Sequence, residues 1–355
     1  DDCLAIADDL WQAVVEEADR ANDFSSSCSF VTFPAYEYTG SPGIANHHRN
    51  IIFRNAIIPG FPPSFFEEPT AEGLWRALAE SCLDSGTGCE ALVIPHNSNW
   101  SNGNLFYVDP SLSPDERREL DALRARLEPL VEIHQHKGDM KCKNGFEGVA
   151  FDPLCDFEKI READFADCGD VPGWGGVNGL GCVSRMDYVR HVLTGGLLEA
   201  LESGVNPFRF GIMASTDTHN GIPGLVGEDG FPGHVGVVDD TALKRLSHGT
   251  ITHDPIVYNP GGLIGAWAEE RSRDALFAAF QRKEVFGTSG PRIVVRLFGG
   301  YDFPDDLCGR DDLAAVGYAQ GAPMGGSLPP HPGGSEAPTF LFRAEADPGV
   351  PGHEG

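Results

Sequence analysis

Several hallmarks of common protein classes are missing from this chain of 355 residues. It has no run of about 18 consecutive apolar residues, so no membrane-spanning helix is predicted. Basic residues are scarce, with 26 Lys and Arg against 53 Asp and Glu and a net charge of −27. Binding to a nucleic-acid backbone needs clustered Lys and Arg, so the composition argues against nucleic acid as the main partner.

Three sequence motifs are also missing. Without a Gly-x-Ser-x-Gly motif, a serine hydrolase is a weak interpretation. No Gly-x-Gly-x-x-Gly follows a predicted strand, so the Gly-rich stretch 169–181 is expected to be a loop rather than a dinucleotide site. None of the nine cysteines forms a Cys-x-x-Cys pair, which argues against a zinc ribbon.

Four cysteines lie close together in an irregular region, at Cys142, Cys155, Cys168 and Cys182. We expect at least one disulfide there, with small buried thiols as the alternative. A disulfide implies an oxidising compartment. The cysteines and the acidic composition together predict a periplasmic or secreted protein.

The chain does contain an Asp and a His just after a predicted strand. The apolar run Phe208–Ala214 indicates a buried strand, and Asp217 and His219 follow it. Side chains two residues apart point the same way along a strand. A carboxylate and an imidazole at one strand end suit a divalent ion such as Zn, Mn or Fe. The alternative is a hydrogen-bonded pair in a loop.

The same pattern recurs at three other predicted strands. Residues 90–97 end near His96, residues 28–39 carry Glu37, and residues 129–137 carry Glu132, His134 and His136 on one expected face. Metal-ligand residue types therefore gather at four strand ends, and helical segments lie between them. This layout predicts a (β/α) TIM-like barrel, whose active site lies at the carboxyl ends of its strands.

Strand-like and helix-like stretches alternate over most of the chain. We expect helices over 4–20, 71–83, 114–127, 184–203 and 271–283, and further strands over 50–58, 262–268 and 285–290. From about residue 299 Gly and Pro dominate, and a strand-like stretch follows over 339–345. The predicted division is a barrel over 1–298 and a segment over 299–355 that begins a β-rich element.

Six motifs together resemble one protein family, the bacterial domain of unknown function 3604, and the resemblance covers nearly the whole chain. They are Ile94-Pro-His-Asn-Ser-Asn99, Glu132-Ile-His-Gln-His-Lys-Gly138, Asn206-Pro-Phe-Arg-Phe-Gly211, Ser215-Thr-Asp-Thr-His-Asn220, Gly262-Leu-Ile-Gly-Ala-Trp-Ala268 and Thr288-Ser-Gly-Pro-Arg292. That family resembles a branch of the PHP (polymerase and histidinol phosphatase) superfamily. The resemblance implies a distorted α/β barrel with two or three metal ions, and usually phosphoesterase activity.

The resemblance also implies a ligand set. Glu37 matches a carboxylate that bridges two metals, His96 matches the His of a Pro-His motif, and Asp217 and His219 match a terminal Asp-x-His pair. His136 is the expected ligand on the intervening strand, with His134 as the alternative. PHP proteins also carry a His-x-His and an Asp-His motif before the Glu strand. Neither precedes Glu37, so we expect a chain truncated at both ends and a barrel that lacks its N-terminal strands.

The expected reaction is metal-assisted hydrolysis of a small anionic substrate. Closely spaced cations lower the pKa of a bound water, and the resulting hydroxide attacks a phosphorus or another ester centre. Glu37 would bridge two metals and Asp217 would orient the nucleophile. Cleavage of an amide or lactone by an amidohydrolase-like reaction is an alternative. A non-catalytic metal-binding barrel is another.

Further residues are candidates to hold the substrate. Arg49, Arg190 and Arg292 can pair bidentately with an oxyanion, although an ordinary salt bridge is the alternative for each. Asn97 is a candidate too, with turn formation as its alternative. His48 either lies near the site or is a turn histidine. The substrate itself, the metal and the oligomeric state stay open.

Overall fold

The strands form several small sheets. The computed structural model describes residues 2–227, 229–249, 254–331, 333–334 and 337–349. One antiparallel sheet has the order β1-β2-β3, and β4 pairs with β7 in parallel. The bounds are β1 (Ala35–Tyr38), β2 (Arg49–Phe53), β3 (Ala91–Pro95), β4 (Leu130–Glu132) and β7 (Gly211–Met213). Two antiparallel pairs follow, β5 (His134–Gln135) with β6 (Gly138–Asp139) and β8 (Leu263–Ala266) with β9 (Val285–Thr288).

The predicted TIM-like barrel is wrong. A (β/α) barrel needs parallel strands that close on one another. Within the described ranges none of the sheets closes, and β4–β7 is the parallel pair. The short turn Pro42–Ile44 follows β1, and β2 returns antiparallel to it. Alternating strand and helix patterns in a sequence do not fix strand direction, and this explains the error.

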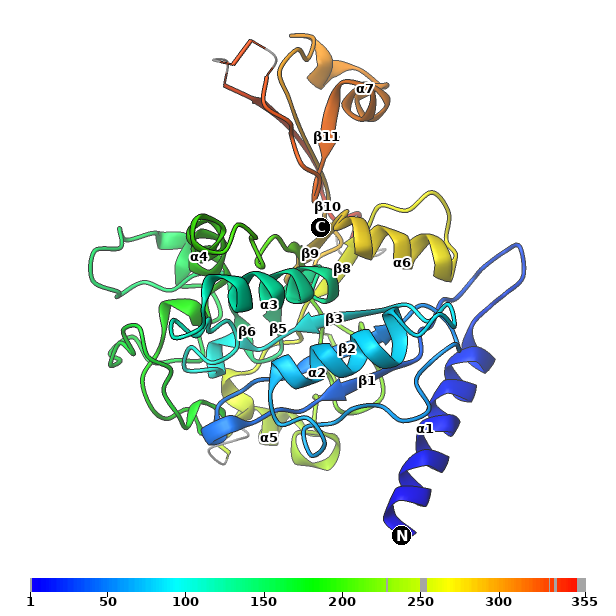
Figure 1. The fold of residues 1–355 in the computed structure, drawn as a ribbon, viewed down its shortest axis with the longest axis vertical. Helices are drawn as coiled ribbons and strands as arrows, with labels where there is room; N and C mark the ends of the chain where they lie inside the picture. Colours follow the sequence, from blue (N-terminus) through cyan, green and yellow to red (C-terminus); the bar gives the residue numbers. More distant parts are fainter. Residues whose placement is uncertain (1, 228, 250–253, 332, 335–336, 350–355) are drawn as a thin grey trace.

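The helices lie close to their predicted positions. They are α1 (Asp2–Ala21), α2 (Ala71–Leu78), α3 (Pro114–Leu127), α4 (Val189–Glu202) and α6 (Arg273–Arg282). The short helix α5 (Ala242–Arg245) was not predicted. Cap residues set several helix starts. Ser113 and Glu116 form a capping box at α3. Figure 1 shows α2 and α3 side by side against the sheet of β1, β2 and β3.

Strand β3 is buried on both faces. Its Val93 packs in a core cluster with α1 and α2, where Trp11 and Leu74 are buried. Its Leu92 and Ile94 pack in a second cluster with β4, β7 and α6. His96 comes directly after β3 and therefore lies where these two core clusters meet.

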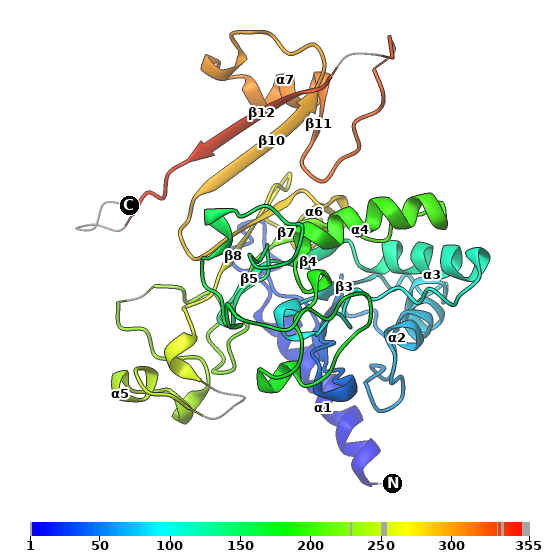
Figure 2. The same ribbon diagram turned by 90° about the vertical axis from the view of Figure 1, so that its left-hand side faces the viewer.

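The C-terminal strands form a separate small sheet. β10 (Val294–Gly300) pairs with β11 (Gly321–Pro323) on one side and β12 (Thr339–Glu345) on the other. Helix α7 (Leu313–Gln320) packs on this sheet, and Figure 2 shows the unit projecting from the body. β10 begins before residue 299, where the sequence placed the boundary. Residues 350–355 of the predicted last segment lie outside the described residues.

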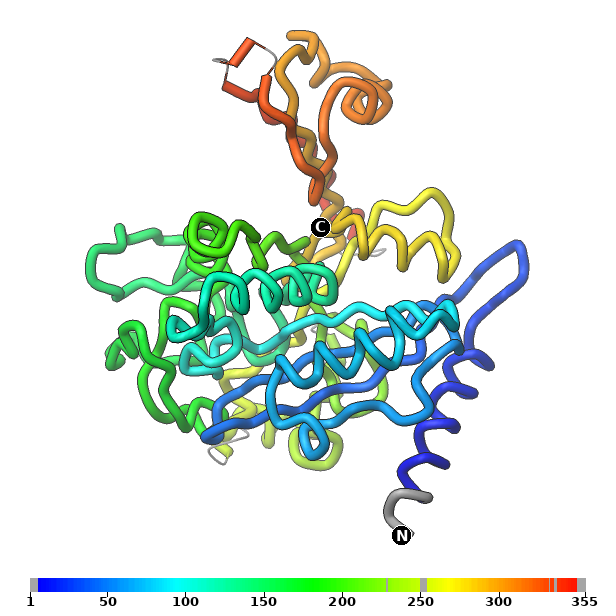
Figure 3. The backbone as a smooth tube through the Cα atoms, in the orientation of Figure 1, coloured from blue at the N-terminus to red at the C-terminus, as the bar shows by residue number. Residues whose placement is uncertain are grey.

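Three disulfides hold the loops. They are Cys82–Cys89, Cys142–Cys155 and Cys168–Cys182, and the last two confirm the expected bridge in the irregular region. Figure 3 traces this region in green along one side of the body. No described helix is long and apolar enough to cross a membrane.

Candidate metal centre

Among the described residues, two groups of His, Asp and Glu side chains could hold a metal ion. Glu37, His48 and His96 make the first donor group, and His136, Asp217 and His219 make the second. Within each group the possible ligand atoms lie within 4.8 Å of one another. Five of these six residues are the ligands expected from the sequence. His48 is the sixth; from the sequence it was open whether it lies near the site or is a turn histidine.

Antiparallel strand pairing assembles the first donor group. Glu37 lies on β1 opposite Asn50 of β2, and His48 directly precedes β2. The backbone N–H of His96 donates to the carbonyl of His48 at 3.4 Å. His48 Nδ1 lies 2.7 Å and His96 Nε2 3.5 Å from the same Glu37 oxygen. One carboxylate oxygen thus faces two imidazoles.

Parallel pairing of β4 and β7 assembles the second donor group. Both strands end on the same side, and His136 and Asp217 follow them. His136 Nε2 lies 3.6 Å from Asp217 Oδ2, and His219 Nδ1 lies 2.7 Å from the Asp217 carbonyl. Asp217 has a φ of +50°, which a non-glycine residue rarely adopts. Such backbone strain gathers at functional sites.

Lys137 and Gln135 hold the Asp217 carboxylate. Lys137 Nζ forms an ion pair with Asp217 Oδ2. Gln135 Nε2 donates to the same oxygen at 2.9 Å. Both partners flank His136 in sequence, so the turn that carries the imidazole also orients the carboxylate.

Glu132 links the two donor groups. It is the last residue of β4 and is buried. Its Oε2 accepts from the backbone N–H of Asn97 at 3.3 Å, and its Oε1 accepts from Ser215 Oγ at 2.5 Å. One carboxyl group therefore ties the segment after His96 to the segment before Asp217.

The first donor group concentrates negative charge on Glu37. Burial by itself raises the pKa of Glu37, but hydrogen bonds from His48 and His96 outweigh it and hold the pKa well below its ordinary value. Burial lowers the pKa of His96, but the Glu37 hydrogen bond and the charge of Asp217 raise it to about 9. These contacts favour a positive charge on His96 beside the Glu37 carboxylate.

Burial and neighbouring charges shift the pKa values of Glu132 and Asp217 in opposite directions. Burial, and then the charge of Asp217, raise the pKa of Glu132 to about 7, against the lowering effect of His96. Burial also raises the pKa of Asp217, but the charges of Lys137 and His96 and the hydrogen bond from Lys137 together outweigh it and lower the pKa. Carboxylates and imidazoles packed together in this way form a donor set for a divalent ion.

A third set of ligand residue types is not available to a metal. Cys142, Asp152 and Cys155 come together, but the two sulfurs are joined in a disulfide. Thiolate is the form of cysteine that binds metal, so this set closes a loop through its disulfide and does not bind a metal.

His134 does not join the donor groups. The predicted strand over 129–137 breaks after Glu132, and β5 turns to pair with β6. The ring of His134 lies 5.8 Å from that of Phe157. The expectation that Glu132, His134 and His136 share one strand face is therefore wrong, because β4 ends at Glu132, His134 lies on β5, and His136 lies in the turn between β5 and β6.

The candidate substrate residues lie in different places. Arg49 is fully buried and its Nε donates to Glu128 at 2.7 Å. Arg190 is on α4 and pairs with Asp152 at 2.8 Å. Arg292 lies after β9 and lines a separate cavity.

Asn97 directly follows His96 and is buried. Its φ of +54° places it in the left-handed region, and its Nδ2 donates to Asn99 Oδ1 at 2.6 Å. Its side chain thus shapes the turn after β3, the alternative that the sequence left open.

Two ring residues beside His136 were missed in the sequence. The ring centroid of His234 lies 4.1 Å and that of Tyr258 4.9 Å from that of His136. Both come from the loop-rich stretch 221–260, without a strand end to mark them. His234 Nε2 lies 2.7 Å from the carbonyl of Asn259, which fixes its ring.

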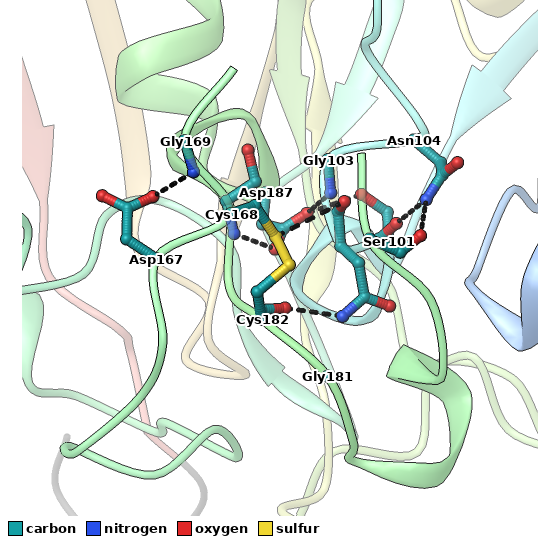
Figure 4. The surroundings of a disulfide bond; sticks show 12 residues. Ser101, Gly103, Asn104, Asp167, Cys168, Gly169, Gly181, Cys182 and Asp187 are labelled. Carbon is teal, nitrogen blue, oxygen red and sulfur yellow. Dashed lines mark hydrogen bonds between the residues drawn. A yellow bond between two sulfur atoms is a disulfide. The ribbon is translucent and has the colours of Figure 1, made fainter. Parts of the chain in front are cut away.

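A disulfide-closed loop clamps the segment after His96. Figure 4 shows the surroundings of Cys168–Cys182, with Asp187 beside Ser101 and Gly103. Asp187 accepts from Ser101 Oγ and from the backbone N–H of Gly103, both at 2.6 Å. Asn102 Nδ2 donates to the carbonyl of Cys182 at 2.6 Å. The backbone beyond the first donor group is therefore fixed from both sides.

The fold and the donor groups define an acidic protein of helices and small sheets with residues that could bind metal ions. The family model described as "Protein of unknown function (DUF3604)" matches residues 1–352, so the chain belongs to this family. Neither a curated protein nor a solved structure matches the chain.

Proposed function

We propose that this protein is a metal-dependent hydrolase of phosphoesters, with a donor set of the PHP kind. The observation that carries the proposal is the pair of donor groups, each of three side chains with ligand atoms within 4.8 Å. Glu132 ties the backbone beside one group to that beside the other. Two neighbouring groups of this type suit a site with two or more metals.

The donor atoms fit a divalent ion of borderline softness. Nitrogen and oxygen ligands of this mixture suit Zn, Mn or Fe. Such ions, when bound, lower the pKa of a water ligand and stabilise charge on the attacked group. Glu37 would hold one ion together with His48 and His96. Asp217 would hold another with two imidazoles.

The residues around the donor groups have positioning roles. Lys137 and Gln135 fix Asp217 Oδ2, leaving the other carboxylate oxygen, Oδ1, for a second contact. Glu132 keeps the segments after His96 and before Asp217 at a constant separation through its two hydrogen bonds. A hydrolytic site needs its reacting groups to be held in the right geometry before the reaction, and these contacts would do so.

We also propose an oxidising compartment, periplasmic or extracellular. The three disulfides support this, because such bonds persist mainly outside the cytosol. An anionic substrate would need cations in the site, since the protein as a whole is acidic.

The test is metal content by mass spectrometry, followed by an activity screen. The purified protein is compared with Asp217→Asn and His96→Gln. The matched controls are Asp84→Asn, at a surface ion pair with Arg126, and His191→Gln, outside both donor groups. We expect metal in the parent and both controls, and loss from the two donor variants.

The screen then separates the reaction classes. With Zn, Mn or Fe added, 4-nitrophenyl phosphate and its diester are offered beside an anilide and a lactone. Hydrolysis of a phosphoester that Asp217→Asn abolishes supports the proposal. Turnover of the anilide or lactone alone favours amidohydrolase-like chemistry. Metal without turnover favours a binding protein, and absence of metal from the parent refutes the metal-dependent mechanism.

A further inference from the structure

A cavity of about 880 Å³ lies beside the second donor group and has no part in metal binding as described above. Its walls are His134 and Phe157, the turn 224–227, Asn259, and the segments 289–293 and 346–349. These come from the end of β9, the end of β12 and loops of the body. Cavities of roughly 300–1,000 Å³ are the usual size for organic ligands.

Two residues singled out in the sequence meet in this cavity. His134 and Arg292 both line it, although neither belongs to a donor group. Ser289, from the family motif Thr288-Ser-Gly-Pro-Arg292, lines it too. The remaining wall is largely apolar and includes Phe157 and Ile293. A few polar groups on an apolar wall are typical of a small-molecule site.

The guanidinium of Arg292 is available to a ligand. Arg292 reaches Asp347 through its backbone N–H, at 2.6 Å from Oδ2, and Gly349 N–H donates to Oδ1 at 2.8 Å. Backbone donors thus occupy both oxygens of that carboxylate. Among the described residues no carboxylate lies within ion-pair distance of the Arg292 guanidinium. An arginine at the edge of an apolar cavity favours an oxyanion, which it can bind bidentately.

The cavity shares a wall with the second donor group. Asn259 lines it, and Asn259 Nδ2 donates to the carbonyls of Gln135 and His136 at 3.2 and 3.3 Å. The carbonyl of Asn259 also contacts His234 Nε2. A molecule in the cavity would therefore contact Asn259, whose side chain bonds to the backbone that carries His136.

We infer that this cavity binds an organic anion with an apolar body, its oxyanion held by Arg292 and Ser289 and its apolar part packed on Phe157 and Ile293. The inference rests on the proposed function in one respect, because it assigns this chemical class to the substrate of the neighbouring donor groups. Glu158 and Asp347 also line the cavity, so a cationic ligand is the competing outcome.

The test uses titration calorimetry with 2-naphthalenesulfonate, and with 2-naphthylmethylamine as a matched cation. Excess chelator is present, so that binding does not depend on metal. The variants are Arg292→Gln, which keeps the backbone contact to Asp347, and Ser289→Ala. Arg190→Gln is the control, an exposed arginine on α4 already paired with Asp152.

We expect the sulfonate to bind, and Arg292→Gln to weaken it about tenfold, the loss of one charge-assisted contact. Ser289→Ala weakens it less, and Arg190→Gln leaves it unchanged. Preference for the amine, equal affinity in Arg292→Gln, or no binding of the sulfonate would each overturn the inference.

The two proposals fail separately. Arg292-dependent binding of the sulfonate, together with no metal in the protein as purified or after loading with Zn, Mn or Fe, refutes the hydrolase and leaves the anion site in place. Metal in the donor groups without such binding refutes the anion site alone.

Discussion

Replacement of Glu128 by Gln should destabilise the protein strongly. The Glu128 side chain is fully buried and accepts from Arg49 Nε at 2.7 Å, Arg124 Nε at 2.8 Å and Trp75 Nε1 at 3.0 Å. Glu128→Gln keeps the shape but removes the charge that balances two buried guanidinium groups. Removal of one partner from a buried ion pair costs about 3–5 kcal/mol. That is a large part of a total stability of about 5–15 kcal/mol.

Urea unfolding followed by circular dichroism measures this loss. With a slope of about 3 kcal/mol/M, the midpoint should fall by roughly 1–2 M. Glu119→Gln is the control, because Glu119 pairs with Arg76 at the surface and should cost about 0–1 kcal/mol. A loss below about 1 kcal/mol in Glu128→Gln would refute the buried cluster and return Arg49 to the candidates for substrate binding.

Three further changes have defined outcomes. Cys168→Ser with Cys182→Ser opens a loop of 14 residues' separation and should lower the free energy of unfolding by about 3 kcal/mol; an unchanged denaturation midpoint would contradict it. Burial raises the pKa of Asp187 to about 6, so between pH 4 and pH 6 this carboxyl is protonated in the folded protein but ionised in the unfolded one. The free energy of unfolding should therefore fall by up to about 3 kcal/mol as the pH rises from about 4 to about 6. Asp187→Asn should flatten that part of the curve, and an identical pH dependence would refute the assignment. Ser113→Ala removes the cap of α3 and should cost about 1 kcal/mol in thermal unfolding, with no loss as the opposing result.

The residues that could bind a metal were easier to predict from the sequence than the architecture was. Glu37, His96 and Asp217 could be recognised because each lies in or shortly after a strand predicted from a local sequence pattern, and these strands are present in the structure. Strand direction depends on partners far along the chain, so a hairpin of β1 and β2 and a parallel pair of β4 and β7 look alike in the sequence.

Residues that only the tertiary fold brings to the site could not be predicted from local sequence patterns. His234 and Tyr258 reach His136 from a loop-rich stretch without periodicity. His134 shares its period with His136, but His134 lies on β5 and His136 in the turn between β5 and β6, and His134 lines the cavity. Arg49 was a candidate to hold an anionic substrate, with a salt bridge as the alternative, and only the packing of Glu128 against it reveals a core ion pair.

The most direct test of the metal centre is an anomalous-difference map from crystals of the protein loaded with Zn or Mn. The account predicts peaks bounded by Glu37, His48 and His96 and by His136, Asp217 and His219. Peaks confined to exposed carboxylates, or the absence of a peak at either donor group, would contradict it.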